Sequence, residues 1–248
     1  MVTKKASVIV AAYNCEPYVE RALQSVFSQT VPGRDYEVIA VDDGSTDNTR
    51  GILNKYRGRI KLISQPNQGL AAACNKGIQQ ASGDYIVRLD ADDYFDRELL
   101  SSTIRVLENM PEYHCVYTDR YEINTLDNTQ TRVNVGKDNL FDMVGCGILF
   151  RRKVFDQIGL YRDLLFEEYD LMLRFFDSGL QGYYLQEPLY YYVKHKSGMT
   201  SQPSYWADGW RQLVDIWGRE KLKNYTDIQI AVKGATRFPI DSLREMGR

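Results

Sequence analysis

The stretch YIVRLDADD, residues 85–93, decides the fold of this chain, because an apolar run in it ends in three closely spaced aspartates. Tyr85–Leu89 has the length and the near-continuous apolar character of a strand that is buried on both faces of a sheet. Asp90, Asp92 and Asp93 come directly after that strand. The sequence therefore predicts a buried strand that delivers an acidic cluster to one edge of a sheet.

Three earlier runs of the same kind precede this strand and alternate with helical patterns. Short β-branched runs that alternate with helices are typical of parallel strands joined by right-handed crossovers. We therefore predict an α/β fold with a mostly parallel sheet flanked by helices. The expected strands are Ser7–Ala12, Glu37–Val41 and Ile60–Ser64, and the expected helices start near Asn14 with Pro17 at an early position, at the Ser45–Asp47 cap region, and at Leu70.

The second half of the chain is less regular. The polar, poorly periodic residues Asp119–Asn139 predict a hairpin or a loop. Tryptophans at helical spacing after Ser201 predict a C-terminal helical appendage, so we divide the chain into a domain at residues 1–200 and a helical extension at 201–248. The other expected elements are helices over Leu99–Leu107, Arg152–Ile158 and Glu167–Asp177 and strands over Cys115–Tyr117, Gly145–Phe150, Gly182–Gln186 and Leu189–Val193.

Composition indicates a globular protein with no general affinity for polyanions. The 248 residues are 44% hydrophobic, which suffices for one large domain. Lys plus Arg number 31 and Asp plus Glu number 33, so the net charge of −2 gives no overall attraction to nucleic acid or to an anionic membrane. No apolar stretch approaches the roughly 18 residues of a membrane span. With four widely spaced cysteines and no Cys-x-x-Cys pair, we expect a soluble, cytoplasmic protein with reduced thiols.

All four expected strands of the first half end in polar residues. Open α/β sheets bind ligands beyond the carboxyl ends of their strands, so these residues should meet in one crevice. Carboxylates grouped in this way can bind a hard divalent ion, and Mg²⁺ typically takes one or two of them while substrate phosphates complete its shell. The alternative is that the aspartates only form turns or cap the next helix. The four ends are Tyr13 and Asn14, Asp42–Ser45, Pro66–Gly69, and the cluster Asp90, Asp92 and Asp93.

The motifs at these strand ends also resemble a known family. No Walker loop and no G-x-G-x-x-G follows the first strand, which favours a metal-bridged diphosphate over a phosphate-cradling loop. From about Ser7 to Thr200 the chain resembles the family-2 glycosyltransferases of the GT-A fold. The motifs that carry the resemblance are SVIVAAYN at Ser7–Asn14, VDDGSTD at Val41–Asp47, NQGLAAACNKG at Asn67–Gly77 and LDADD at Leu89–Asp93.

The resemblance implies an inverting transfer of a sugar from a nucleoside diphosphate sugar, with UDP as the expected nucleotide. Asp92, the last carboxylate of the Asp-x-Asp motif, would hold Mn²⁺ or Mg²⁺ against the diphosphate. Asp90 would approach the ribose, and Asp93 would contact the donor sugar or fix a loop. Cys74 stands where the family often has arginine, so one nucleotide contact is missing. The residues implied to border the nucleotide are Ala11, Tyr13, Asp43, Asn67 and Gly69, with Asp43 accepting a hydrogen bond from the base.

The second half should supply the base that takes the proton of the acceptor hydroxyl. FEEYDL at Phe166–Leu171 resembles the family's acidic motif at a helix start, and Glu168 occupies the position of the catalytic carboxylate. The helix N-terminus would favour its ionised form. Glu167 or Asp170 remain alternatives for this role, and a further alternative is that all three only stabilise the first helical turn.

The segment YVKHKS at Tyr192–Ser197 resembles a family segment whose basic residues meet the diphosphate or the metal. The resemblance implies that His195 is a metal ligand. Val193 replaces an arginine of the family, so Lys194 or Lys196 would supply the positive charge beside the diphosphate.

The expected partners are a UDP-sugar donor and a hydroxyl acceptor on a glycan or a lipid-linked saccharide, in surface polysaccharide synthesis. A non-catalytic nucleotide-sugar binding protein is the main alternative. A nucleotidyltransferase is a third, although the chain lacks the glycine-rich basic loop that such an enzyme needs.

The aromatic stripe of the C-terminal helix has two interpretations. Trp206, Trp210, Ile216 and Trp217 would dock on the inner face of a membrane or on a partner, or they would pack on the catalytic domain or within a homo-oligomer. Basic residues do not cluster there, which favours packing.

Overall fold

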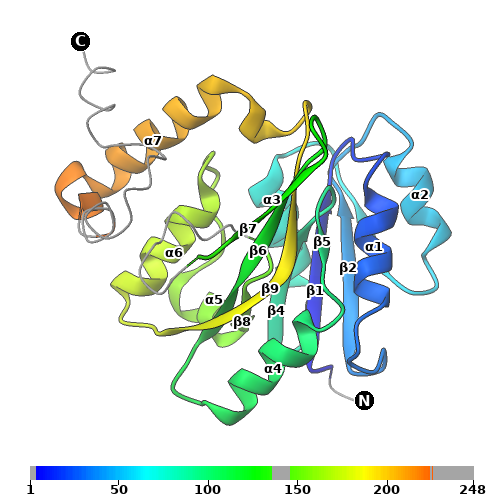
Figure 1. Ribbon diagram of the computed structural model, residues 1–248, viewed down its shortest axis with the longest axis horizontal. Coiled ribbons are helices and arrows are strands. Elements are labelled where there is room, and N and C mark those ends of the chain that lie inside the picture. The colour runs from blue at the N-terminus through cyan, green and yellow to red at the C-terminus, as the bar shows by residue number, and fades with distance from the viewer. Residues whose placement is uncertain (1–3, 136–145, 224, 226–248) are drawn as a thin grey trace.

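The computed structural model describes residues 4–135, 146–223 and 225, and its first half consists of strands that alternate with helices (Figure 1). All four strands expected in this half are present, with bounds that differ from the predicted ones by at most one residue. The elements of this half are β1 (Ala6–Ala12), α1 (Val19–Phe27), β2 (Tyr36–Asp42), α2 (Thr49–Lys55), β3 (Lys61–Ser64), α3 (Leu70–Gln79), β4 (Tyr85–Asp90), β5 (Tyr94–Phe95) and α4 (Leu99–Asn109).

In its described part, the second half contains a hairpin, a short antiparallel strand, a long strand and several α-helices. The hairpin that Asp119–Asn139 predicts is present as far as residue 133, and residues 136–145 lie outside the described part of the chain. The elements are β6 (Cys115–Asn124), β7 (Thr129–Val133), β8 (Leu149–Arg151), α5 (Lys153–Ile158), α6 (Glu167–Asp177), β9 (Gly182–Lys194), a 3₁₀ turn η2 (Met199–Ser201) and α7 (Pro203–Trp217).

Within the described ranges, nine strands form one sheet in the order β3-β2-β1-β4-β8-β6-β9-β5, with β7 paired to β6. β1 pairs in parallel with β2 and with β4, and β2 pairs in parallel with β3. β8 is antiparallel to both of its neighbours. The carboxyl ends of β1 to β4 therefore lie at one edge of the sheet, as the sequence predicts.

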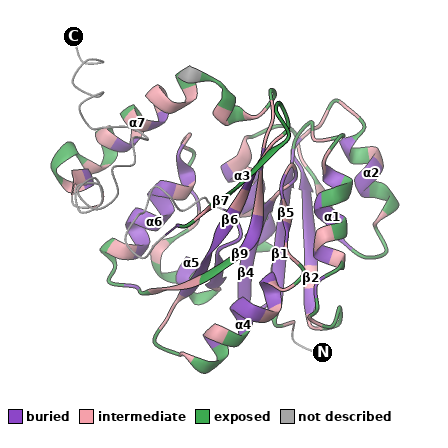
Figure 2. Ribbon diagram, viewed as in Figure 1, coloured by how far each residue is buried: buried purple, intermediate pink, exposed green. Residues whose placement is uncertain are grey.

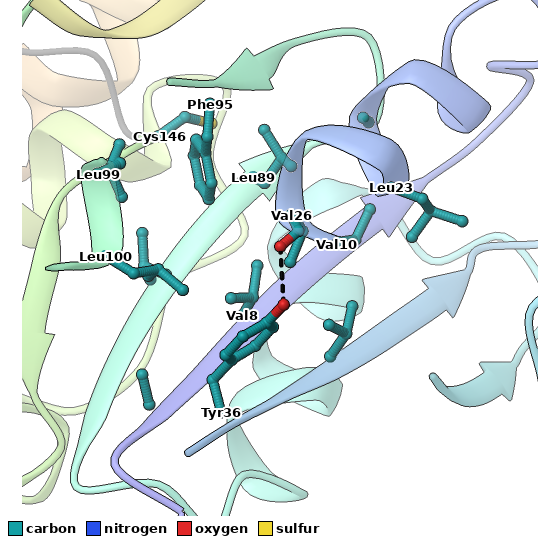
Figure 3. Close-up of a cluster of buried hydrophobic side chains, with 14 of the residues drawn as sticks. Val8, Val10, Leu23, Val26, Tyr36, Leu89, Phe95, Leu99, Leu100 and Cys146 are labelled. Carbon is teal, nitrogen blue, oxygen red and sulfur yellow. Dashed lines mark hydrogen bonds between the residues drawn. The ribbon is translucent and has the colours of Figure 1, made fainter. Parts of the chain in front are cut away.

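Two hydrophobic clusters cover the two faces of the sheet. Side chains alternate along a strand, so Val8 and Val10 enter one cluster while Ile9 and Ala11 enter the other. Helices α1, α2 and α4 pack on the first face, and α3, α5, α6 and α7 pack on the second. The central strands β1, β2 and β4 are consequently buried in Figure 2, while the outer faces of the helices are exposed. Figure 3 shows the first cluster, in which the buried hydroxyl of Tyr36 donates to the carbonyl of Val26 at 2.9 Å.

Helix α1 starts later than the sequence predicts. It begins at Val19, and Pro17 lies in the turn before it. Asn14, the expected cap, adopts φ 51°, a left-handed conformation that asparagine tolerates. Its Oδ1 accepts the N–H of Thr46 at 2.8 Å, so the side chain bonds the loop before α2 and leaves α1 uncapped.

The prediction of two strands over Gly182–Gln186 and Leu189–Val193 is wrong, because β9 is one continuous strand. Its parallel pairing with β6 shifts register on both sides of Asp119, which pairs with Pro188. A bulge accommodates a proline that has no N–H to donate, so the strand bends there without ending.

Helix α7 packs its aromatic residues inward. Gly209 is buried against the ring of Phe166, which lets the helix come close to the start of α6. Trp206 and Trp210 meet the Phe166 ring edge to face with centroids 5.6 Å away, and Trp217 Nε1 donates to Asp170 Oδ1 at 3.0 Å. These contacts agree with the packing interpretation of the aromatic stripe. The division at residue 200 stays a prediction, and residues 226–248 lie outside the described part.

None of the helices in the described part of the chain has the length and apolar character needed to cross a bilayer. The four cysteines are all free thiols.

Candidate active site

The loops that follow β1, β2 and β3 are bonded to one another. Asn14 N–H donates to Ser45 Oγ at 3.1 Å, while Asn14 Oδ1 accepts from Thr46. Gly44 has φ 77°, and a Cβ there would lie 2.7 Å from the backbone nitrogen of Asn67. The three strand-end loops therefore form one continuous edge, as the crevice argument expects.

Asp43 is buried, and protein donors engage both of its carboxylate oxygens. Oδ1 accepts from the Gln65 side chain at 2.7 Å and from Gln68 N–H at 3.0 Å, and Oδ2 accepts from Gly69 N–H at 2.9 Å. The carboxylate thus fixes the loop between β3 and α3. A hydrogen bond from a nucleobase to the Asp43 carboxylate stays a prediction, since it would add to or replace one of these bonds.

Two side chains of the predicted nucleotide site face solvent at this edge. The ring of Tyr13, just after β1, is 46% exposed, and Asn67 is exposed in the loop before α3. Ala11 is buried within β1. An exposed aromatic ring beside a strand end provides a flat apolar face on which a base can stack.

The three aspartates of the acidic cluster have different surroundings. Asp90 is held by Arg88, and Asp92 contacts His195. Asp93 is buried, with one oxygen accepting from Val193 N–H at 2.7 Å and the other from the Tyr190 hydroxyl. Burial and the neighbouring carboxylates raise the pKa of Asp93 well above its usual value. Asp93 therefore ties β9 to the acidic cluster, which matches the loop-fixing alternative for this residue.

Arg88 is a site residue that the sequence analysis missed. It lies two positions before Asp90 on β4, so both side chains point to the same face of the sheet. Its Nε and Nη2 donate to the two oxygens of Asp90 at 2.7 and 2.9 Å, and its Nη1 donates to Glu167 Oε1 at 2.8 Å. The sequence does contain a signal for Arg88, because a charged residue inside an apolar central strand is buried and needs a partner of opposite charge.

Asp92 and His195 meet across the crevice. His195 Nε2 lies 3.0 Å from Asp92 Oδ2, and His195 Nδ1 lies 2.9 Å from Ser197 Oγ. Tyr18 stacks on the imidazole with ring centroids 4.5 Å apart, and Arg21 donates to the Asp92 carbonyl at 2.9 Å. Metal-binding histidines characteristically have their second ring nitrogen held by such a bond. This oxygen and nitrogen pair fits a divalent cation, as the sequence predicts for these two residues.

A second group of potential ligand atoms lies deeper. Asp90, Asp93 and Cys146 bring one ligand atom each within 4.8 Å of one another, and Cys146 was not anticipated from the sequence. Both carboxylates are already bonded by protein donors, and burial raises the pKa of the Cys146 thiol well above its usual value. The partly exposed Asp92 is therefore the better candidate to reach an ion that also contacts a substrate.

Three carboxylates lie at the start of α6, and two of them are fully engaged. Glu167 accepts from Arg88. Asp170 is buried and accepts from Arg174 Nε at 2.9 Å, from Arg162 Nη1 at 3.2 Å and from Trp217. Glu168 Oε2 is buried and finds no hydrogen-bond partner in the part of the chain that the structure describes. Of the three, Glu168 has an oxygen free to accept a proton.

At Glu168, burial affects the pKa more than the helix N-terminus does. The sequence predicts that the helix dipole keeps this carboxylate ionised. Instead, burial and the adjacent carboxylate of Glu167 raise the pKa of Glu168 well above 4.5, while Arg88 opposes the rise. A carboxylate with a raised pKa is a stronger base once it is ionised.

Lys194, expected beside the diphosphate, is paired within the protein. Its Nζ donates to Glu122, whose other oxygen accepts from Arg120 Nη2 at 2.8 Å. A diphosphate would have to compete with Glu122 for this ammonium, so the role of Lys194 stays a prediction.

The comparison with protein families gives one clear match. Residues 7–159 match the family model described as Glycosyl transferase family 2. The putative glycosyltransferase EpsE of Bacillus subtilis is 33% identical to this chain over 201 residues, which cover 75% of this chain and 72% of that protein. Chondroitin synthase of Pasteurella multocida is 38% identical over 121 residues, 48% of this chain, and the match covers 12% of that protein. The chain thus corresponds to a small part of the chondroitin synthase.

A solved structure shares the fold. TarS 1–349 of S. aureus in complex with UDP-GlcNAc matches this chain with a TM-score of 0.72 at 19% identity, covering 96% of this chain and 77% of that chain. The likeness confirms the GT-A fold that the motifs predict.

Proposed function

This chain belongs to glycosyl transferase family 2, and on that premise we propose that it transfers a sugar, with inversion, from a UDP-sugar to a hydroxyl of a saccharide or lipid-linked acceptor. The observation that supports the proposal most strongly is that the acidic cluster at the end of β4 lies near the carboxylate of Glu168, whose Oε2 has no partner among the described residues. Arg88 bonds Asp90 on β4 and Glu167 on α6, and this brings Glu168 next to the cluster. An inverting displacement needs this arrangement, a held leaving group on one side and a base on the other.

Glu168 is the base in this proposal. The acceptor oxygen attacks the anomeric carbon, the bond to the nucleoside diphosphate breaks, and the hydroxyl proton passes to Glu168 Oε2. Glu167 and Asp170 are bound to arginines, which supports Glu168 over both alternatives. Because its pKa is raised, Glu168 binds the proton more strongly than an exposed glutamate would.

Asp92 and His195 would hold Mn²⁺ or Mg²⁺ on the donor side. The ion, when bound, offsets the negative charge that grows on the departing diphosphate. Ser197 and Tyr18 keep the imidazole in place, and Arg21 fixes the backbone of Asp92. The metal-binding pair is therefore preorganised by residues from α1 and from the segment after β9.

Tyr13, Asn67 and Gly69 form the nucleotide-facing edge in this proposal, with Ala11 and Asp43 behind them. The exposed ring of Tyr13 is available to stack on uracil. Arg88 holds the carboxylate of Asp90, which contacts the ribose in this proposal. The TarS complex with UDP-GlcNAc supports UDP as the nucleotide.

The acceptor belongs to polysaccharide synthesis in this proposal. The similarity to a chondroitin synthase supports a saccharide acceptor. We place the reaction in the cytoplasm, at the inner face of the membrane when the acceptor is lipid-linked.

A thermal-shift measurement tests the proposal. Binding to the folded state raises the melting temperature, so UDP with Mn²⁺ should stabilise the protein and UDP with a chelator should do so less. Asp92→Asn should abolish the metal-dependent part, while Asp127→Asn in the exposed hairpin turn should behave as the parent. Absence of stabilisation by every nucleoside diphosphate tested with Mn²⁺ would overturn the proposal.

Turnover separates the enzyme from the binding-protein alternative. The parent should release UDP from a UDP-sugar in the presence of an acceptor, and Asp92→Asn should not. Binding of UDP without turnover of any donor, over a panel of acceptors, would favour a non-catalytic nucleotide-sugar binding protein.

A further inference from the structure

Arg88 is the link between the two sides of the site. It is buried, and each of its three nitrogens donates a hydrogen bond, Nε and Nη2 to Asp90 and Nη1 to Glu167. The planar guanidinium suits this double task, because its fork matches a carboxylate and still presents a further N–H group. One cation thus positions a carboxylate of β4 and a carboxylate of α6 relative to each other.

The charges around Glu168 show what this link does. Glu167 from the same helix and Asp90 from β4 disfavour its ionised form, and Arg88 from β4 favours it. Tyr205 faces it from α7 as a neutral phenol whose pKa is raised by burial and by Glu168. Arg88 is therefore the cation that offsets two neighbouring carboxylates.

Without Arg88, the two glutamates would become equivalent. Adjacent buried carboxylates share protons, because both cannot be ionised at low cost. Burial raises the pKa of Glu167, but the bond from Arg88 opposes this rise and favours the anion, while Glu168 keeps an oxygen with no partner in the described ranges. The arginine thereby distinguishes two neighbours of identical chemistry.

We propose that Arg88 is a positioning residue that aligns Asp90 for the donor and, by binding Glu167, leaves Glu168 as the carboxylate that accepts the proton. This inference rests on the proposed glycosyl transfer for its catalytic consequence. Its structural part, the selection of Glu168 by Arg88, does not depend on which sugar or acceptor is used.

The test compares four variants by titration and by kinetics. Arg88→Met removes the cation, Arg88→Lys keeps the charge but cannot form the bidentate bond, and Arg88→Met with Glu167→Gln also removes the carboxylate left unpaired. Arg162→Met is the control, because it removes a different arginine, one bonded to Asp170, which lies on α6 like Glu167 and Glu168. The titration midpoint of Glu168 is measured by carbon NMR of labelled glutamate, assigned with Glu168→Gln.

Arg88→Met should raise the midpoint of Glu168 by about one pH unit or more, since a nearby opposite charge is lost. It should also lower kcat roughly 100-fold, the size expected when a reacting group is misplaced. The double variant should bring the midpoint down again, because Glu167 no longer repels the charge on Glu168. Arg88→Lys should leave the midpoint near that of the parent but raise the KM for the donor.

Arg162→Met should change neither the midpoint nor kcat. If Arg88→Met does not fold, the lysine and double variants decide the question. The inference would be overturned if the double variant had the same Glu168 midpoint as Arg88→Met and if Arg88→Lys had the kcat and KM of the parent. A parent protein with the expected titrations but no turnover of any nucleotide sugar would overturn the proposed function and leave the inference standing.

Discussion

The two halves of the molecule contribute to the site in different ways. In the first half, residues 6–109, the polar side chains that follow β1 and β2 bond neighbouring strand-end loops, as Asn14 does with Thr46 and Asp43 does with Gly69. In the second half, Glu168 lies at a helix start with a buried oxygen that lacks a partner among the described residues. The first half forms a fixed edge, and the second half brings a reactive group to it.

The difference follows from topology. Four parallel strands place their ends at one edge of the sheet, so loops that are far apart in sequence become neighbours that can bond. The second half reaches the same edge through an antiparallel strand, a bulged strand and a helix start. Substitution of Glu168 in the second half should therefore affect chemistry, and substitutions in the loops after β1, β2 and β3 should affect stability and donor binding.

The largest expected effect is that of Glu168→Gln. The amide cannot accept the acceptor's proton, and loss of a general base lowers kcat by roughly 100- to 10,000-fold. Binding of UDP with Mn²⁺, followed by thermal shift, should stay at the parent level because Asp92 and His195 are untouched. Steady-state kinetics with a saturating donor measure the loss.

The pH dependence provides the check on this prediction. In the parent, kcat should rise with pH through the raised pKa of Glu168, well above 4.5, because the base acts in its ionised form. The same raised pKa means that stability falls as pH rises from about 4.5 through the folded-state value, since the fold disfavours the anion. Glu168→Gln should lose the dependence of kcat and the part of the stability dependence that Glu168 contributes, while Asp93 and Glu167, whose pKa values are also raised, keep theirs. Parent-like kcat in this variant would transfer the role to Glu167 or Asp170.

We expect Asp170, in the second half, to have a purely structural role. The variant Asp170→Asn tests this expectation. Asp170 is fully buried between Arg174, Arg162 and Trp217, and removing one member of a buried pair costs about 3 kcal/mol of unfolding free energy. Urea unfolding measures the loss. Asp177→Asn, at the exposed end of the same helix, breaks a pair with Lys221 and should cost less than about 1 kcal/mol.

Equal losses in these two variants would contradict the assignment of Asp170 as a structural residue. A kcat that falls with unfolding free energy unchanged would make Asp170 a catalytic group instead.

The predictability of the fold also differs between the halves. Near-continuous apolar runs identified β1, β2 and β4, since a strand buried on both faces has to be apolar throughout, whereas β3 lies at the sheet edge and is partly exposed. The same criterion wrongly predicted two strands separated at Pro188 where β9 is continuous. The bulge that accommodates this proline depends on pairing with β6, which the local sequence of β9 does not show. The start of α1 was misplaced for a related reason, namely that Asn14 bonds a loop more than thirty positions away.

The site was predictable as far as single segments carry it. Asp92, His195 and Glu168 were predicted from their motifs, and the structure brings Asp92 Oδ2 and His195 Nε2 to 3.0 Å. Arg88 and Cys146 were missed, because their importance comes from contacts with residues distant in sequence. Periodicity indicates on which face of a strand or helix a side chain lies, but not which residue from a distant part of the chain it contacts.

Gly44→Ala tests whether the first half is as tightly bonded as the comparison suggests. A left-handed alanine costs about 1–2 kcal/mol, and its Cβ would lie 2.7 Å from the nitrogen of Asn67. We expect a loss of about 2 kcal/mol in urea unfolding. Gly179→Ala has positive φ but open space and should lose less, and Gly33→Ala, with neither constraint, should lose nothing measurable. Equal losses at Gly44 and Gly179 would show that the loops are not in close contact.

The smallest expected effect connects the two halves, and it concerns the hydroxyl of Ser197. This hydroxyl lies 2.9 Å from His195 Nδ1, and a partner that orients a metal-binding imidazole is typically worth about 10-fold in metal affinity. Ser197→Ala should therefore raise the Mn²⁺ concentration needed for half-maximal activity by about 10-fold, with kcat at saturating metal unchanged. Ser201→Ala is the matched control, since its hydroxyl donates to backbone carbonyls of the same segment without touching the imidazole. A Mn²⁺ requirement equal in the two variants would mean that Tyr18 alone orients the ring, and the position of His195 would then depend on the first half of the molecule.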